Sequence, residues 1–206
     1  MPDLDAIRAH AASCTLCPLH ETRTQVVFGR GNPDASIVLV GEGPGRDEDL
    51  QGSPFVGAAG QLLDKILLAV GLGEDEVFIT NTVLCRPPGN RVPLPPEMEA
   101  CRVHREAILR AIDPPIVVLL GATALKAVFG PKAGITAMRG QRLEQDGRCY
   151  YPTFHPAALL RDASRKRPVW RDFQRIVADY RLIQVASAQG DATGSPSPGP
   201  DGEESR

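Results

Sequence analysis

The fold is decided by the stretch Ser36-Ile37-Val38-Leu39-Val40-Gly41-Glu42-Gly43-Pro44-Gly45. Its first five residues form a short apolar run, which predicts a buried β-strand. The glycines and the proline that follow let the backbone turn sharply and approach a ligand closely. Since ligands of open α/β sheets bind beyond the carboxyl ends of the strands, we expect this loop to border a ligand site.

Strand-like and helix-like segments alternate along the rest of the chain. Residues 115–121 are uniformly apolar, which is typical of a central strand covered on both faces. The same reasoning predicts strands at 77–80 and 149–153 and helices at 57–71, 95–112, 122–129 and 168–182. This alternation predicts an α/β fold, with three α/β/α layers around a central, mostly parallel sheet of four strands.

The length and composition favour one domain followed by a tail. A chain of 206 residues, 42% of them hydrophobic, can bury one substantial core, and we assign residues 1–185 to that domain. Residues 186–206 contain Ala, Gly, Ser, Pro and acidic residues but no large apolar residue. Since nothing there offsets the entropy of ordering, we expect the tail to be disordered.

Charge is distributed unevenly. The net charge is −2, but the tail contributes −3 through four acidic residues and one arginine, so the domain carries about +1. Within it, residues 139–175 contain nine Lys and Arg against four Asp and Glu. Such a segment suits phosphates, although a solvated helix face has a similar composition.

Neither a membrane span nor an export signal is evident. No apolar run approaches transmembrane length, and residues 1–12 lack the basic and then apolar layout of a secretory signal. We therefore expect a cytoplasmic protein without a membrane partner, and we expect a monomer.

Five cysteines in such a chain favour metal ligation or reactive thiols over disulfides. Cys14 and Cys17 form a C-x₂-C pair, while Cys85 and Cys101 enclose fifteen residues rich in proline. Four thiolates suit zinc or an iron-sulfur cluster, and spacing decides neither between these nor whether the two pairs meet. Cys149, in a strand-like segment, is most simply a buried small apolar residue.

A second polar loop, Thr153-Phe154-His155-Pro156-Ala157, follows the last predicted strand. Like the loop at 41–45, it places a polar residue between residues that shape the backbone. Together the two loops predict an active site at one edge of the sheet. Taken singly, a His-Pro in a loop is usually structural, and Asn81, which follows another strand, could be a turn or cap residue.

Four motifs stand in order along the chain: GEGPG at 41–45, QGSPFVG at 51–57, NTVLCRPPGNR at 81–91 and TFHPAALLR at 153–161. Together they resemble the family 4 uracil-DNA glycosylases, the iron-sulfur branch of a superfamily that removes uracil from DNA. The resemblance covers about residues 14–182. It implies an enzyme of base-excision repair that hydrolyses the N-glycosidic bond, releases uracil and leaves an abasic site, without lyase activity.

The resemblance also implies a [4Fe-4S] cluster, which spacing left open, on Cys14, Cys17, Cys85 and Cys101. We expect the cluster to be structural because hydrolysis requires no electron transfer.

The implied uracil pocket has a stacking face and a selective amide. Phe55 is the aromatic platform. Asn81 would accept from uracil N3 and donate to O4, a pattern that cytosine reverses. By resemblance, Glu48 lies on the loop that closes the space around the C5 methyl of thymine. The expected substrate-binding residues are Gly41, Gly43, Phe55, Asn81 and His155.

Bond cleavage leaves negative charge on uracil O2, so a preorganised donor lowers the barrier. We expect His155 to donate as a neutral imidazole. Water must then reach C1′, and the candidates to position or activate it are Glu42 first, then Asn90 and Glu48.

The partner implied is uracil-containing DNA, single-stranded or double-stranded, whose target nucleotide must leave the base stack. Behind His155, Leu159 and Leu160 are candidates for a wedge, although both could be core residues. Arg161, Arg165, Lys166 and Arg167 are candidates for phosphate contacts.

Two rival functions belong to other classes. The first is a non-enzymatic nucleic-acid-binding module stabilised by its metal centre. The second is a nucleotide-phosphate hydrolase, suggested by the glycine-rich turn after a strand. It is disfavoured because no Gly-Lys-Ser/Thr follows GEGPG and because Glu42 stands where phosphates need donors.

Overall fold

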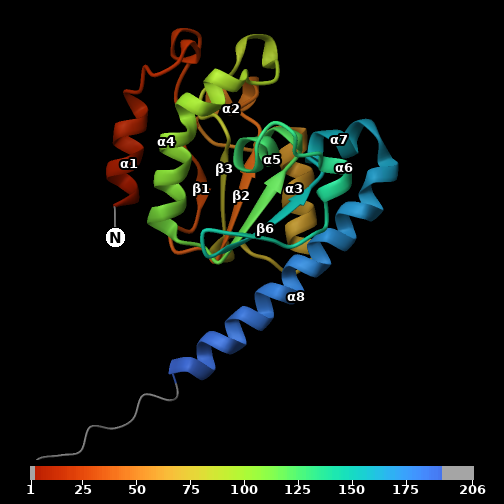
Figure 1. Cartoon of the computed structure of the whole chain (residues 1–206). Coiled ribbons are helices and arrows are strands. Elements are labelled where there is room, and N and C mark those ends of the chain that lie inside the picture. Colours follow the sequence, from red (N-terminus) through yellow and green to blue (C-terminus); the bar gives the residue numbers. More distant parts are fainter. Residues whose placement is uncertain (1–2, 192–206) are drawn as a thin grey trace, which may run out of the picture.

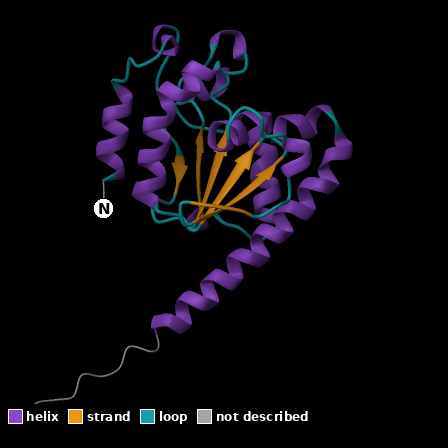
Figure 2. Ribbon diagram, in the orientation of Figure 1, coloured by secondary structure: helices purple, strands orange, loops and turns teal. Residues whose placement is uncertain are grey.

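The computed structural model describes residues 3–191, and a twisted sheet forms the centre of the fold (Figures 1 and 2). Its four longer strands are β2 (Ile37–Gly41), β3 (Val77–Asn81), β4 (Ile116–Leu120) and β6 (Arg148–Thr153). They run parallel in the order β3-β2-β4-β6. All residues of β2, β3 and β4 are buried, as expected for strands covered on both faces.

Two short edge strands complete the sheet. β1 (Arg30–Gly31) pairs with β3 and β5 (Leu143–Gln145) pairs with β6, both antiparallel, which gives the order β1-β3-β2-β4-β6-β5. The predicted α/β class and parallel centre are confirmed, but the predicted number of four strands is wrong. Segments of two and three residues are too short to show a periodic pattern in the sequence.

Helices cover both faces of the sheet and make the predicted three layers. Val38 and Val40 of β2 pack in one core and Ile37 and Leu39 in the other, because successive strand residues point to opposite faces. The first core is covered by α1 (Leu4–Ala12), α4 (Pro95–Ile112) and α5 (Ala122–Phe129), and the second by α3 (Ala58–Ala69), α7 (Pro156–Arg161) and α8 (Lys166–Asp191).

Shorter helical turns shape the loops between these elements. They are α2 (Arg46–Gln51), α6 (Ile135–Met138), η1 (Pro18–Glu21), η2 (Glu74–Glu76), η3 (Pro88–Asn90) and η4 (Ala163–Arg165). At the start of α4, the buried Glu97 accepts from the backbone N–H of Leu94 at 2.7 Å and pairs with Arg91 at 2.6 Å. The bond from Arg91 lowers the pKa of Glu97, so this carboxylate closes the proline-rich loop in its charged form.

The last helix is longer than predicted. We expected it to end near Leu182 and the tail to begin at 186, yet α8 continues to Asp191. The alanines of this stretch favour helix, which the composition argument for disorder did not weigh. The rest of the predicted tail, residues 192–206, lies outside the described residues.

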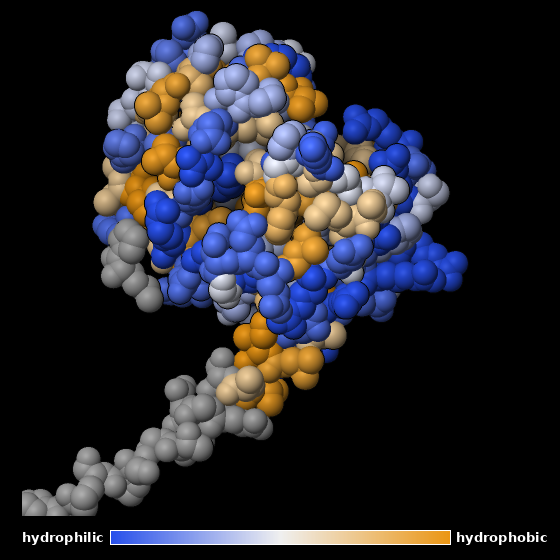
Figure 3. Space-filling view, viewed as in Figure 1, coloured by the Kyte–Doolittle hydropathy of each residue, from blue (hydrophilic) through white to orange (hydrophobic). Residues whose placement is uncertain are grey.

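The C-terminal end of α8 projects from the body of the protein (Figure 1), and its exposed Leu182 and Val185 form an apolar patch there (Figure 3). None of the helices within residues 3–191 combines the length and hydrophobicity needed to cross a bilayer.

Candidate active site

The parallel strands bring the two predicted loops to the same edge of the sheet. Gly41 at the end of β2 pairs with Asn81 at the end of β3, and Leu120 at the end of β4 pairs with Thr153 at the end of β6. The arrows of these strands point to the same edge (Figure 2). The GEGPG loop, Asn81 and the His155 loop therefore meet where open α/β sheets bind ligands.

Gly41, Asn81 and Phe55 form the floor of the site. A Cβ added to Gly41 would overlap Asn81 Oδ1 and would lie 2.6 Å from Phe55 Cζ, so only glycine lets these two side chains pack against the end of β2. Phe55 has a φ of 57° and is buried, and its ring stacks on the imidazole of His155 with centroids 5.6 Å apart. The structure thus brings together a flat aromatic face, an amide and an imidazole.

His155 is fixed in the tautomer that the proposed chemistry needs. It caps the start of α7, where its Nδ1 accepts from the backbone N–H of Ala157 at 3.2 Å. A neutral ring that accepts at Nδ1 carries its proton on Nε2, an assignment that follows from the hydrogen bond. Burial, and then Arg161, lowers the pKa of His155 to about 4, so the ring is neutral at physiological pH.

Glu42 is held by a residue that the sequence analysis did not identify. Thr123, in the first turn of α5, donates from Oγ1 to Glu42 Oε2 at 2.5 Å. Thr123 itself is 7% exposed, so it is a fixed donor, whereas Glu42 is partly exposed and lines the adjoining cavity. The hydrogen bond leaves the carboxylate oriented at the edge of the site.

Glu48 has a different set of partners. Its Oε1 accepts from the backbone N–H groups of Val56 at 3.1 Å and Gly57 at 2.9 Å, and its Oε2 accepts from Gly45 at 3.1 Å. These bonds tie the GEGPG loop to the loop that carries Phe55. The contacts therefore favour Glu42 over Glu48 as the carboxylate that handles water.

Asn90 lies beside Glu42 in a small groove. The groove has a volume of about 130 Å³ and is also lined by Gly43, Pro44 and Pro87. Asn90 is exposed, has a φ of 56° and accepts from Arg86 Nε at 2.6 Å. This placement is compatible with the predicted alternative that Asn90 orients the water.

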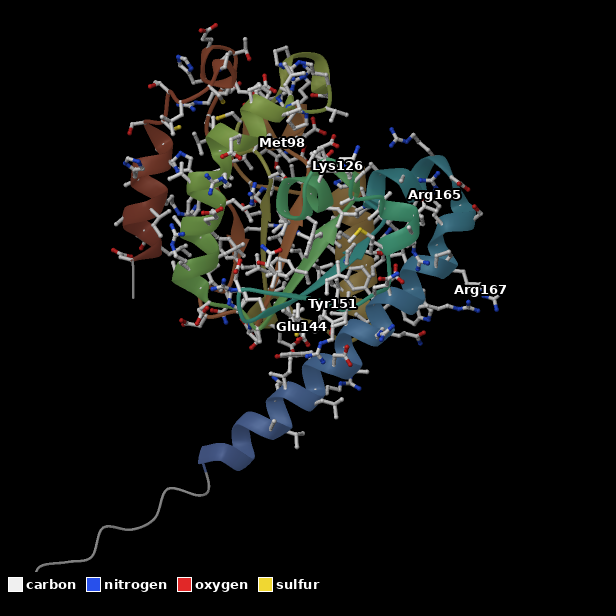
Figure 4. All side chains as sticks on the ribbon, in the orientation of Figure 1. Met98, Lys126, Glu144, Tyr151, Arg165 and Arg167 are labelled. Carbon is white, nitrogen blue, oxygen red and sulfur yellow. The ribbon has the colours of Figure 1, made fainter. Side chains whose placement is uncertain are left out.

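A larger cavity of about 910 Å³ opens from the same edge. Glu42 and His155 line it at the sheet, and Met98, Lys126 and Arg165, all labelled in the upper half of the molecule in Figure 4, line it as well. Arg161 belongs to the same wall, so three cations face the space next to the site.

The other residues predicted to contact DNA divide into two groups. Leu160 is 53% exposed, but Leu159 is 2% exposed and packs in the core between α7 and the sheet. Leu159 is therefore a core residue, and its assignment to DNA contact is corrected. Lys166 and Arg167 are exposed but do not line the cavity, and Arg167 points away from the body (Figure 4).

A buried carboxylate supports the His155 loop from behind. Asp172 of α8, 5% exposed, accepts from Thr153 Oγ1 at 2.6 Å and pairs with Arg139, which also donates to Pro168 O at 2.7 Å. The guanidinium of Arg139 lies 5.4 Å from the centre of the Phe154 ring. These contacts fix the end of β6 and hence the start of the loop.

The four cysteines predicted to be ligands line one small pocket, called the cysteine corner below: Cys14, Cys17, Cys85 and Cys101. The two predicted pairs therefore meet. Arg23 Nη1 donates to Cys85 Sγ at 3.1 Å, and His104 lines the same pocket. Cys149 is buried in the core away from this corner, as predicted.

Burial makes three thiols of the cysteine corner, those of Cys17, Cys85 and Cys101, weaker acids while no metal is bound. It raises the pKa of Cys101 to about 12 and raises those of Cys17 and Cys85. As they stand, no three His, Cys, Asp or Glu side chains within residues 3–191 are arranged to hold a metal ion. The soft, clustered donor set nevertheless suits a thiolate-bound centre.

Sequence reasoning missed Thr123, Lys126 and Asp172. Thr123 and Lys126 are three residues apart on a segment identified only as a helix, and three residues place side chains on one helix face. The available signal was their position directly after β4, at the same edge as the two polar loops. Asp172 gave no signal, since its partners lie 19 and 33 residues away.

The family model and the relatives that match this chain belong to the same superfamily. A model of the uracil DNA glycosylase superfamily matches residues 28–174. The chain is 46% identical over 176 residues to a type-4 uracil-DNA glycosylase of Thermotoga maritima, covering 84% of this chain and 92% of that protein. It is 42% identical to the type-4 enzyme of Archaeoglobus fulgidus (85% and 92% covered) and 30% identical to a type-5 enzyme of Pyrobaculum aerophilum (70% and 74% covered).

Proposed function

The chain belongs to the uracil DNA glycosylase superfamily, and on this premise we propose that it is a uracil-DNA glycosylase of the type-4 kind. It hydrolyses the N-glycosidic bond of uracil in DNA, releases the free base and leaves an abasic site for base-excision repair. The observation that carries this proposal is that Glu42, Asn81 and His155, each from a different strand end, lie at the same edge of the sheet, where Asn81 and Phe55 pack on Gly41.

Uracil would be recognised by shape and by its hydrogen-bonding edge. The Phe55 ring offers a face for stacking, worth roughly 1–3 kcal/mol per base. The amide of Asn81, at the end of β3, would accept from N3–H and donate to O4. Cytosine reverses both requirements, and a bidentate contact of this kind discriminates by about 1–3 kcal/mol.

The bond would break with charge moving onto uracil O2. His155 would donate its Nε2–H to that oxygen, which is supported by the acceptor role of Nδ1 toward Ala157. Because the donor is neutral and already oriented, it stabilises the developing anion without a proton transfer.

Water would complete the reaction at C1′. We assign its positioning to Glu42, which is supported by the orientation that Thr123 imposes on the carboxylate. Asn90, in the same groove, is the alternative residue for this step. Glu48 would act on the geometry of the loops through its three backbone partners.

DNA would lie across the cavity that begins at Glu42 and His155. Arg161, Arg165 and Lys126 face that cavity and would contact phosphates. Leu160, exposed next to them, would occupy the gap left by the extruded nucleotide.

The cysteine corner would hold a [4Fe-4S] cluster through Cys14, Cys17, Cys85 and Cys101, a ligand set supported by their shared pocket. When bound, the cluster cross-links the N-terminal segment to the loop before α4 and takes no part in hydrolysis. Iron and acid-labile sulfide analysis of the purified protein tests it, and zinc in place of iron would contradict it.

The activity is tested with end-labelled oligonucleotides that carry one uracil, thymine or hypoxanthine, followed by alkali to cut abasic sites. We expect cleavage at uracil alone. His155→Ala and Asn81→Ala should lose rate while DNA binding changes little. Binding without any cleavage by the metal-loaded wild type would instead establish the nucleic-acid-binding module.

A further inference from the structure

A second polar cavity lies away from the candidate active site. It has a volume of about 350 Å³ and is lined by α4, the end of α5 and the hairpin between β5 and β6. Four of its lining residues are arginines: Arg102, Arg105, Arg110 and Arg148. Glu144 of β5, a neighbour in sequence of the lining residue Gln145, is labelled low on the body in Figure 4, below Lys126.

Arg105 is a buried charge without a carboxylate partner. It is 3% exposed, and its Nη2 donates a hydrogen bond to the carbonyl oxygen of Ala127 at 3.1 Å. That bond satisfies a carbonyl in the last turn of α5, which gives Arg105 a structural role. Its Nη1, however, is buried without any hydrogen-bond partner.

Arg148 presents a second unsatisfied donor to the same cavity. Its Nη2 donates to Leu109 O at 3.2 Å and to Asp113 Oδ1 at 2.5 Å, but its Nε is buried without a partner. Only three side-chain atoms in the described part of the chain are buried and unpartnered, and two of them belong to residues that line this cavity. Buried polar groups nearly always have hydrogen-bond partners, so two unpartnered arginine nitrogens beside one cavity point to a ligand that supplies acceptors.

The arginines around the cavity differ in their ion pairs. Two lining residues are acidic, Glu106 and Asp146, and outside the lining Glu99 pairs with Arg102 and Asp113 with Arg148, so Arg105 is the lining arginine without an ion pair. Glu106 is already paired with Arg102 at 3.0 Å and with Arg110 at 3.7 Å. Burial lowers the pKa of Arg105, and the nearby Glu106 offsets this only in part. A buried cation without a counter-ion is strongly unfavourable, so an anion would stabilise this region.

We propose that this cavity binds the phosphate group of a small organic phosphate, such as a nucleoside monophosphate. A phosphate offers several acceptor oxygens, which suit the guanidinium groups of Arg105 and Arg148, each of which has one unpartnered nitrogen. The buried Tyr150 lines the same wall, and Leu109 and Val128 supply apolar surface for an organic body. A volume of about 350 Å³ falls within the usual range of small-molecule sites.

The site is separate from the proposed glycosylase site and does not depend on that activity. None of the residues that line it also lines the groove beside Glu42 and Asn90, and only Ala127 and Val128 of α5 are shared with the large cavity. The backbone of DNA outside the lesion carries the same phosphate group as a small organic phosphate. The experiment below therefore includes DNA as a competitor.

Binding of AMP to the full-length protein is measured by titration calorimetry, with adenosine and inorganic phosphate as separate probes. We expect saturable binding of AMP and none of adenosine. Arg148→Gln, which removes Nε as a cationic donor, should weaken AMP binding at least about tenfold, or about 1.4 kcal/mol. Arg105→Lys keeps the charge, removes the guanidinium fork and should weaken it similarly.

Control variants test whether AMP binds in this cavity, and unfolding measurements test whether each variant is folded. Arg142→Gln lies in the same hairpin region but outside the cavity, where Arg142 pairs with Glu144, so it should leave AMP affinity unchanged. An Arg161→Gln/Arg165→Gln double variant should also leave it unchanged. Thermal unfolding verifies that each variant is folded, and if Arg105→Lys is not, Arg148→Gln and the exposed Arg102→Glu decide the result.

Three results would overturn the proposal. They are no saturable binding of AMP or phosphate to the wild type, binding of adenosine equal to that of AMP, and AMP affinity that is unaltered in folded Arg148→Gln and Arg102→Glu proteins. If uracil-free duplex DNA displaces AMP from the Arg161→Gln/Arg165→Gln variant, the cavity binds backbone phosphates and the small-molecule ligand is rejected.

Discussion

The candidate active site and the cysteine corner are assembled in opposite ways. At the active-site edge, side chains of different types come from four separate loops, and Glu42, His155 and Asn90 keep part of their surface in contact with the cavities. At the corner, four side chains of one type converge from three segments, and burial raises the pKa of Cys17, Cys85 and Cys101. The first arrangement suits a passing ligand and the second a permanent one. Substitutions should therefore separate catalytic rate from stability.

The largest effect is expected at His155. His155→Ala removes the donor to uracil O2 and should lower the single-turnover rate by about 10²–10³-fold, the usual loss for one such donor. Thermal unfolding should change little, because the bond that His155 makes within the fold is one cap of a six-residue helix. A rate within about tenfold of wild type would contradict the assignment.

The cysteine corner should show the reverse. Cys101→Ser removes one thiolate and should cost about 3 kcal/mol of unfolding free energy, the scale for cross-linking a loop of about 15 residues. Iron content should fall with it. Cys149→Ser, at a buried cysteine outside the corner, is the matched control and should retain full iron. Loss of iron without loss of stability would show that the centre does not hold the fold.

Asn81 sharpens the comparison within the active site. Asn81→Ala should raise the activation free energy on uracil by about 1–3 kcal/mol, which lowers the rate roughly 5- to 150-fold, because the bidentate contact is lost. Asn81→Asp would present an acceptor where O4 needs a donor and should lose at least as much on uracil. Equal rates for wild type and both variants would show that another group selects the base.

Substitution of Thr123 should have a smaller effect, which is confined to kcat. Thr123→Val keeps the shape of the side chain but removes its hydrogen bond to Glu42. We therefore expect the activation free energy to rise by about 1 kcal/mol, so that kcat falls roughly fivefold while KM changes little. Thr123→Ser restores the hydroxyl and should recover most of the rate. Failure of serine to recover it, with valine impaired, would indicate packing and not orientation of Glu42.

The pH dependence should be the smallest effect. Because the pKa of His155 is lowered to about 4, the folded protein keeps the neutral ring as the pH falls from about 7 to 5, and single-turnover rates should show no loss centred near 6.5. The free energy of unfolding should decline over that range, because His155 takes up a proton with a pKa of about 6.5 in the unfolded chain but stays neutral in the folded chain. A rate transition near 6.5 that disappears in His155→Ala would contradict the neutral donor.

Much of the fold could be read from the sequence because its signals are local. The apolar runs of β2 and β4 and the proline-started α4 are each visible within one window of residues. The strands β1 and β5 could not be read, because they exist only through pairing with a neighbour. The end of α8 was placed too early because composition, without helix propensity, set the boundary.

The sequence by itself determined the chemical inventory: the order of the motifs, the four cysteines, and His155, Asn81 and Glu42 as polar residues at strand ends. Only the tertiary structure decided which partners those residues have. In the folded protein, Glu42 accepts a hydrogen bond from Thr123, 81 residues away, and Glu48 accepts hydrogen bonds from three backbone N–H groups. Leu159 is buried, whereas Leu160 is exposed. It also brought Arg105 and Arg148 to one cavity. Strand formation follows from local pattern, whereas hydrogen-bond partners and burial depend on which distant segments pack together.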